Sequence, residues 1–170
     1  MDANLLITCD PSHSGKAKDE VTALLKDAGE KATFIDSDVE GLLLLKVKDA
    51  KKAVKELIGV FNDDSSRFEL TFKWTPIDKW CSSDLASLSN EMKKFDAKIG
   101  ADESWKMDLN KRQYQGSTTD LIMKLTENIT KPKVDLKNPQ KIVKVEIIGE
   151  NAGIALLDAS ELLDVPKMKR

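Results

Sequence analysis

The feature that most constrains the fold is the way the hydrophobic period changes along the first half of the chain. Four segments of strand length are apolar or alternate between apolar and polar residues: residues 4–9, 32–37, 42–47 and 68–74. Two stretches with apolar residues at helical spacing separate them, residues 17–28 and 50–61. Ser14 and Asp49 are the predicted N-caps of these helices, and Gly29 is the predicted end of the first.

The predicted order is strand, helix, strand, strand, helix, strand, which is the split βαβ pattern of a ferredoxin-like module. In the last strand, alternation predicts that Phe68, Leu70, Phe72 and Trp74 share one face. A segment with Pro76 among polar turn residues follows. We therefore expect residues 1–78 to form a ferredoxin-like N-terminal domain.

The second half predicts a different succession of elements. A helix carries an apolar stripe at Leu85, Leu88, Met92, Phe95 and Ile99. Next come an alternating strand from residue 105, a helix over residues 121–129, a short extended piece at 134–136, and two apolar strands, 141–148 and 152–158, joined by a hairpin at 149–151. We expect an α/β core over residues 79–165 and a basic tail over 166–170, so the fold class is α+β.

Charge is distributed unevenly. The net charge is −2, which excludes a uniformly basic nucleic-acid-binding chain. Residues 1–80 carry 12 basic and 15 acidic side chains, and residues 104–144 carry nine basic and four acidic ones. That window of +5 predicts a local phosphate-binding patch, although a solvated lysine-rich surface has the same composition.

Catalytic and metal-binding patterns are missing from the sequence. His13 is the single histidine, Cys9 and Cys81 lie far apart, and neither a phosphate-binding loop nor a glycine-rich dinucleotide loop occurs. The carboxylate pairs Asp63–Asp64 and Asp102–Glu103 lie in turn-rich segments, where burial and a shifted pKa are not expected. We expect no catalytic centre, no metal and no cofactor.

Neither a membrane span nor a signal peptide is expected. The densest apolar run, residues 42–45, is only strand length, and the N-terminus lacks a basic region before a long apolar one. The two cysteines are expected to be reduced thiols. These features predict a cytoplasmic protein.

Four segments of the second half resemble a known family. Lys133-Val134-Asp135-Leu136-Lys137-Asn138-Pro139, followed by Ile142-Val143-Lys144-Val145-Glu146-Ile147-Ile148-Gly149, resembles the C-terminal core of THUMP domains. Ala152-Gly153-Ile154-Ala155 looks like the next strand of that family, and Trp105 to Arg112 resembles its strand that ends in a basic pair. The likeness covers about residues 80–160 well and residues 1–78 loosely.

The resemblance implies a role in tRNA modification. No methyltransferase, sulfur-transferase or pseudouridine synthase sequence follows, so the chain looks like the free-standing THUMP adaptors for tRNA 4-acetylcytidine formation. In that family the adaptor holds the acceptor stem and 3′ end of tRNA, and a separate RNA cytidine acetyltransferase performs the chemistry. The expected partners are therefore tRNA and that enzyme, with no small-molecule substrate. The expected RNA-binding residues are Lys106, Lys111, Arg112, Lys137, Lys141 and Lys144.

One departure from the family and two alternatives bear on this hypothesis. The chain has only three arginines, and lysine holds phosphate as a point charge, so the expected affinity is weak and salt-sensitive. Trp74, Trp80 and Trp105 could stack on unpaired bases, but a tryptophan on an alternating strand more often belongs to the core. A protein–protein interaction module and a detached domain of a tRNA-modifying enzyme are the alternative functions.

Overall fold

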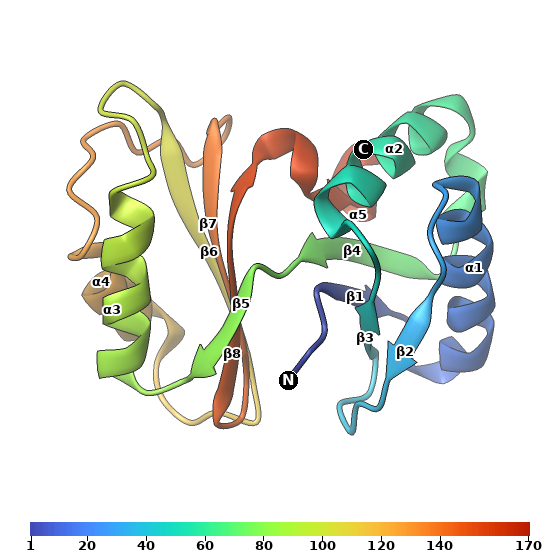
Figure 1. Ribbon diagram of the computed structural model, residues 1–170, viewed down its shortest axis with the longest axis horizontal. Helices are drawn as coiled ribbons and strands as arrows, with labels where there is room; N and C mark the ends of the chain where they lie inside the picture. The colour runs from blue at the N-terminus through green and yellow to red at the C-terminus, as the bar shows by residue number, and fades with distance from the viewer. The chain divides into compact units, whose positions relative to one another are not determined.

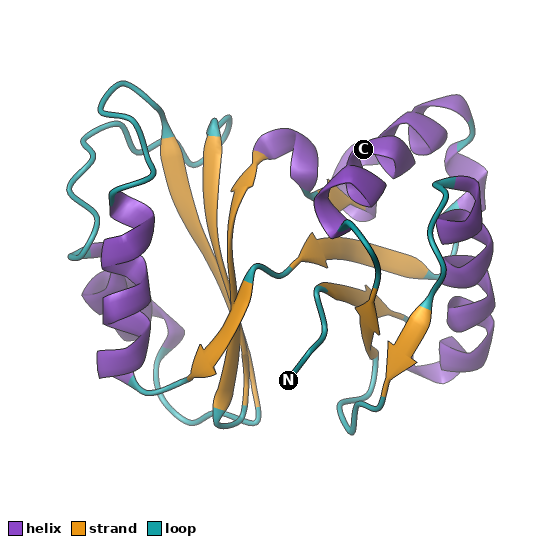
Figure 2. Ribbon diagram, in the orientation of Figure 1, coloured by secondary structure: helices purple, strands orange, loops and turns teal.

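The computed structural model describes residues 1–170 and separates them into two units (Figures 1 and 2). The first unit comprises Met1–Ile77 together with Ser160–Arg170, and the second comprises Asp78–Ala159. Each unit contains one β-sheet with helices packed on it, so the predicted α+β class is confirmed. None of the helices is both long enough and apolar enough to span a bilayer.

The first unit has the predicted ferredoxin-like connectivity. Its strands are β1 (Leu5–Cys9), β2 (Thr33–Ile35), β3 (Leu42–Lys46), β4 (Thr71–Pro76) and a short β9 (Leu163–Asp164). They lie in the order β2-β3-β1-β4-β9, and all neighbours are antiparallel. Helices α1 (Ser14–Asp27) and α2 (Ala50–Asp63) provide the crossovers. Because β3 lies between β1 and β2, and β1 lies between β3 and β4, each crossover spans one strand, which is the split βαβ arrangement.

The core of the first unit forms where the two helical stripes meet the central strands. Buried apolar residues of α1 and α2 pack with those of β1 and β3 in one cluster, which also contains Phe68 and Trp74. The rings of Phe68 and Trp74 meet edge to face with centroids 6.2 Å apart. Trp74 is fully buried, so it is a core residue and no platform for a base.

Helix capping agrees with the prediction at α2 and differs at α1. Asp49 accepts the backbone N–H of Lys52, so it is the N-cap of α2 as predicted. Ser14 is already helical, because the 3-10 turn η1 (Pro11–His13) precedes α1 and Asp10 caps that turn. Gly29 follows α1 with φ of 76°, a conformation that favours glycine.

Strand β4 begins at Thr71, later than the predicted start at residue 68. The Glu20 carboxylate accepts the backbone N–H groups of Glu69, Leu70 and Thr71, and this removes residues 69 and 70 from the strand ladder. The alternation fails at Phe72, which is 38% exposed while Trp74 is fully buried, because the pairing of β4 with β1 shifts by one residue between the Ile7–Trp74 and Cys9–Thr71 pairs.

The C-terminal residues return to the first unit. β9 pairs with β4, and the short helix α5 (Val165–Met168) follows it. Leu163 is fully buried in the core cluster of that unit, and Val165 belongs to the same cluster. The predicted ranges 79–165 and 166–170 thus differ from the observed division, because Leu163 and Val165 bury their side chains in the first core.

The second unit contains a four-stranded mixed sheet with two helices on one face (Figure 1). Its strands are β5 (Lys79–Ser82), β6 (Trp105–Arg112), β7 (Lys141–Ile148) and β8 (Asn151–Asp158), in the order β5-β8-β7-β6. Helices α3 (Leu85–Asp96) and α4 (Thr118–Thr126) bury Leu88, Met92, Leu121 and Leu125 against Val143, Val145 and Ile147. Strand β5 was not predicted, because its polar sequence was interpreted as a linker.

A buried carboxylate ties β5 to α3. Glu91 on α3 is 8% exposed and accepts hydrogen bonds from Lys79 Nζ on β5 at 2.7 Å and from Lys94 Nζ at 3.2 Å. The bond from Lys79 lowers the pKa of Glu91, and burial of the carboxyl opposes that shift only in part. The pair therefore links the short edge strand β5 to α3.

We expect Leu163→Ala to lower the free energy of unfolding by about 2–5 kcal/mol, because it leaves a cavity in the core of the first unit. Urea denaturation followed by circular dichroism measures this. Leu162→Ala is the matched control, since Leu162 is only half-buried, and it should cost less than half as much. Equal effects of the two changes would contradict the placement of the C-terminal segment.

We expect Glu91→Gln to be less stable than the unchanged protein at pH 7, with a difference that shrinks in acid. A depressed carboxyl pKa stabilises the fold above its unfolded value of about 4.3, and this contribution is lost as the pH falls through the folded pKa. Urea denaturation at pH 7 and at pH 3 measures the difference. Glu127→Gln, at an exposed position, serves as the control, and a pH-independent difference for Glu91→Gln would refute the explanation.

Candidate nucleic-acid interface

The direction of each basic side chain on β6 follows from strand alternation. Trp105, Met107 and Leu109 belong to the core beneath the helices, so Lys111 shares their face. Lys106, Asp108, Asn110 and Arg112 then lie on the opposite face of the sheet. The predicted basic pair Lys111–Arg112 is therefore split between two faces.

Lys144 is buried and paired, which corrects its predicted role. Its side chain is 0% exposed, and its Nζ lies 2.7 Å from Asp108 Oδ2 and 3.1 Å from Glu146 Oε1. Burial works against the charged amine, but the carboxylates of Glu146 and Asp108 outweigh it and raise the pKa of Lys144. An ammonium group with no solvent access and two carboxylate partners is not available to a phosphate.

Arg112 completes a chain of alternating charges on the same face. Its NH1 lies 2.7 Å from Glu146 Oε2, and the Asn110 side-chain amide donates to Glu146 Oε1 at 3.1 Å. The Glu146 side chain is 2% exposed, whereas that of Arg112 is 20% exposed. The guanidinium is thus held in one orientation, with N–H groups left over that can donate to a phosphate.

Lys111 and Lys106 keep more of their donor capacity. The Lys111 ammonium donates to the backbone carbonyl of Gly116, in the loop that leads into α4. Lys106 is half-buried, and the ion pairs of the structure do not include it. Both remain candidates for contact with phosphate.

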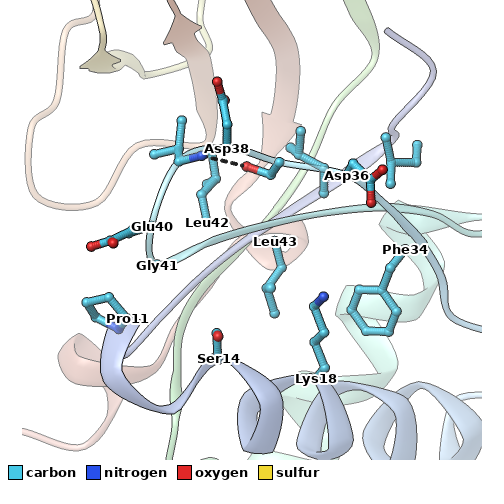
Figure 3. A pocket seen from close by; sticks show the side chains of 14 residues that line it. Pro11, Ser14, Lys18, Phe34, Asp36, Asp38, Glu40, Gly41, Leu42 and Leu43 are labelled. Carbon is cyan, nitrogen blue, oxygen red and sulfur yellow. Dashed lines mark hydrogen bonds between the residues drawn. The ribbon is translucent and has the colours of Figure 1, made fainter.

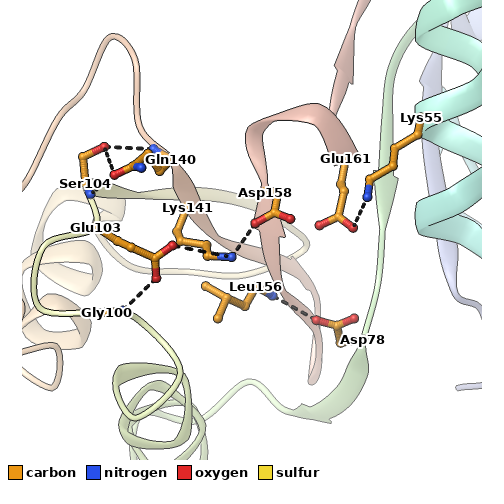
Figure 4. A network of polar contacts seen from close by, with 10 residues as sticks. All are labelled: Lys55, Asp78, Gly100, Glu103, Ser104, Gln140, Lys141, Leu156, Asp158 and Glu161. Atoms are coloured by element: carbon orange, nitrogen blue, oxygen red, sulfur yellow. Dashed lines mark hydrogen bonds and ion pairs between the residues drawn. The ribbon is translucent and has the colours of Figure 1, made fainter.

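Lys141 is engaged by two carboxylates at the start of β7, as Figure 4 shows. Its ammonium pairs with Asp158 at the end of β8 and lies 3.8 Å from Glu103 Oε2. Glu103 also accepts the backbone N–H of Gly100 at 2.7 Å. Glu103 and Asp158 neutralise the charge of Lys141, so Lys141, like Lys144, is not available to bind a phosphate.

Lys137 is exposed but lies at the other end of β6 from Arg112. The segment that carries it is fixed to the start of β6, where the backbone N–H of Asp135 donates to the carbonyl of Trp105 at 3.0 Å. With a rise of about 3.3 Å per residue, the seven steps from Trp105 to Arg112 span about 23 Å. The six predicted residues therefore do not form one patch: Lys111 and Arg112 lie at one end of β6, Lys106 and Lys137 near the other.

An apolar groove that sequence reasoning missed lies beside this second end. It has a volume of about 360 Å³, and its apolar lining comprises Trp105, Met107, Ile122, Ile129, Val134 and Leu136. Val134 is 58% exposed and Leu136 is 73% exposed. In the sequence, Val134 and Leu136 lie between Lys133 and Lys137, and this pattern predicted only a short extended segment.

The first unit has a cavity of about 420 Å³ between the start of α1 and the segment from Phe34 to Leu44 (Figure 3). Asp36, Asp38 and Glu40 line it, and Lys18 lies with its Nζ 5.5 Å from the centre of the Phe34 ring. Three carboxylates against one ammonium disfavour a phosphate here. This cavity therefore does not extend the candidate interface.

Asp10, Ser12 and His13, from which no catalysis is expected, lie together in a way that resembles a catalytic triad. Ser12 Oγ lies 3.0 Å from His13 Nδ1, and Asp10 Oδ2 lies 3.1 Å from the same nitrogen. A triad needs the serine and the carboxylate on opposite ring nitrogens. Because both contacts use Nδ1 in an exposed turn, the imidazole does not relay a proton between them. No group of three or more His, Cys, Asp or Glu side chains is placed to hold a metal ion.

Comparison with protein families identifies the second unit. Residues 87–157, from α3 to the end of β8, match the model of the THUMP domain. The chain carries a THUMP domain. The matched residues include the buried charges on β6 and β7, so this ionic cluster lies inside the THUMP domain. No curated protein matches the chain by sequence.

Solved structures share the fold over nearly the whole chain. PH1313 from Pyrococcus horikoshii matches 95% of this chain and 55% of its own, with a TM-score of 0.64 and 14% identity. TrmN from Thermus thermophilus matches 89% of this chain and 44% of its own, with a TM-score of 0.56 and 16% identity. The chain thus spans about half the length of these proteins, and at this identity the likeness concerns the fold.

We expect Lys144→Met to lower the free energy of unfolding by about 3–5 kcal/mol, because it leaves the buried Glu146 with one fewer cation. Chemical denaturation at pH 7 measures the loss. Lys106→Met is the matched control on the same face of the sheet, and it should change stability by less than about 0.5 kcal/mol. A Lys144→Met protein as stable as the control would show that the ionic cluster adds nothing.

Proposed function

We propose that this protein is a tRNA-binding adaptor that acts in the cytoplasm and has no catalytic centre of its own. In this proposal its THUMP domain holds the acceptor stem and 3′ end of tRNA. A separate RNA cytidine acetyltransferase then forms 4-acetylcytidine. The observation that carries the proposal is the THUMP match over residues 87–157, a domain type of tRNA-modifying proteins.

The charges at the far end of β6 support a phosphate contact there. Arg112 is oriented by the buried Glu146, and Lys111 is held by the Gly116 carbonyl beside the start of α4. Donors fixed by neighbouring groups lose less conformational freedom when a phosphate binds. We therefore assign the main contact to Lys111 and Arg112, with Lys106 and Lys137 as further contacts along the strand.

The charge of the first unit favours a role as a spacer over a role as a second RNA-binding site. The first unit, residues 1–77 and 160–170, carries 16 acidic and 14 basic side chains, and the acidic side chains around its cavity would repel phosphates. In the proposed adaptor this unit sets the distance from the acceptor end to the modified nucleotide. The acetyltransferase supplies acetyl-CoA and ATP.

The length of the matched proteins favours a second candidate function. PH1313 and TrmN extend well beyond the part that this chain matches. A domain that serves a tRNA-modifying enzyme, supplied in the same or another chain, would use the same RNA contacts. Reconstitution separates the two functions, because an adaptor increases 4-acetylcytidine formation when it is added to purified acetyltransferase, tRNA, acetyl-CoA and ATP.

We expect replacement of Lys106 and Lys111 by glutamine to weaken tRNA binding by about tenfold and to reduce its salt dependence. Each lost phosphate contact lowers the slope of log K against log salt by about 0.9 on a duplex. Fluorescence anisotropy with full-length tRNA at two salt concentrations measures both effects. Arg112 is left unchanged, because a carboxylate at this position would lie beside the buried Glu146 and destabilise the fold.

The matched control replaces Lys26 and Lys48, two exposed lysines of the first unit, by glutamine. It should leave the affinity within about twofold. Equal losses in both double variants would mean that binding depends on total charge and would refute the site. A tRNA that lacks its 3′-terminal nucleotides should bind more weakly than the intact molecule, and equal binding would contradict recognition of the 3′ end.

A further inference from the structure

We propose that the apolar groove between α4, the start of β6 and residues 129–137 docks an acidic segment of a protein partner that carries apolar anchor side chains. We call it the α4 groove. The proposal rests on the shape, composition and charge of the groove and does not depend on the tRNA contacts. It assigns the apolar lining of the groove to a protein, while Lys106 and Lys137 nearby keep their proposed phosphate contacts.

Exposed apolar side chains lie around the groove. Six large hydrophobic side chains of the whole chain are exposed, and three of them, Met123, Val134 and Leu136, lie on α4 or on the wall of the groove. Their exposed fractions are 62%, 58% and 73%. Exposed apolar groups gathered beside a concave site mark an interaction surface. The volume of about 360 Å³ falls within the range of binding clefts.

Hydrogen bonds already hold the wall of the groove in place. The indole N–H of Trp105 donates to the Lys131 carbonyl at 2.9 Å, and the Trp105 backbone N–H donates to the Lys133 carbonyl at 2.9 Å. The Asp135 carboxylate accepts the backbone N–H groups of Lys137 and Asn138, both at 3.0 Å. These bonds hold the exposed wall in place, so little order has to be gained on binding.

Lysines outnumber acids along the wall of the groove. Lys131, Lys133 and Lys137 follow the wall of the groove, and the one acid among them, Asp135, is turned onto the backbone. Lys131 lies 3.9 Å from Asp96, and Lys133 lies 3.7 Å from Asp102, whose side chain is 99% exposed. The Lys131–Asp96 pair is shielded, with 22% and 19% of its side chains exposed, but the exposed Lys133–Asp102 pair contributes little, and an acidic partner can replace it.

The lining of the groove suits the side chains of a protein better than the bases of RNA. Unpaired bases bind by stacking on aromatic rings or on arginine planes. The single aromatic residue of the groove, Trp105, is 3% exposed and its N–H is already bonded. The accessible walls are aliphatic or thioether side chains, which suit the leucine-type anchors of an amphipathic segment.

The test uses a fluorescein-labelled acidic peptide of roughly 16 residues, with leucines at the i, i+3, i+4 and i+7 spacing of a helix-in-groove ligand. We expect saturable binding by anisotropy. Leu136→Ser should weaken it by roughly tenfold, the factor for losing contact with one apolar side chain. Leu136 is largely exposed, so the change leaves the fold intact. Leu85→Ser, at an exposed apolar position on α3 outside the groove, should change binding less than twofold.

Two further measurements decide the identity of the occupant. A peptide with lysine in place of its acidic residues should not bind, and equal binding would overturn the charge argument. Leu136→Ser should leave tRNA affinity unchanged within about twofold. If this variant loses tRNA binding as strongly as peptide binding, the groove belongs to the RNA site and the proposal is wrong. Failure of the acidic peptide to bind, or binding that Leu136→Ser does not weaken, also overturns it.

Discussion

The parallel pairing of β6 with β7 is the constraint on which the second unit depends. All eight residues of β6 are in register with β7, so Asp108 lies beside Lys144 and Asn110 beside Glu146. This register places two carboxylates and two cations in an alternating row. A slip of one residue would turn Lys144 and Glu146 into the apolar core under the helices. The buried charges therefore fix the register, and the register fixes where Lys106, Lys111 and Arg112 are directed.

Much of the fold was predictable because its local signals agree with its packing. The Asp49 cap and the two helical stripes of the first unit are local, and the structure has both. The misses arise from contacts distant in sequence. Glu20 takes up backbone N–H groups some 50 positions away, and β5 is held by a carboxylate on the next helix. Leu163 joins a core built by residues before 78. Hydrophobic period carries no information about such partners.

The candidate site was less predictable than the fold, because a count of lysines does not reveal their partners. Lys144 and Lys106 occupy equivalent places in an alternating strand, yet the first is buried between two carboxylates and the second has no ion pair. The THUMP-like residues Val143, Lys144, Val145 and Glu146 were found from sequence, but the structure gives the two charged members a role inside the sheet. The net charge of residues 104–144 thus points to the second unit as the site of RNA binding, but it overstates the number of side chains that can bind phosphate.

The two proposed contacts use opposite ends of one rigid strand. The phosphate contact depends on Lys111 and Arg112 at the end of β6, and the α4 groove begins at Trp105, the first residue of that strand. About 23 Å of paired strand separates them, so an occupant of the groove need not displace RNA held at Arg112. Lys106 and Lys137 lie near the groove end, where an acidic segment would compete with phosphates for their charge. An adaptor built in this way would hold RNA most firmly at the Arg112 end, and partner binding would loosen the RNA only at the groove end.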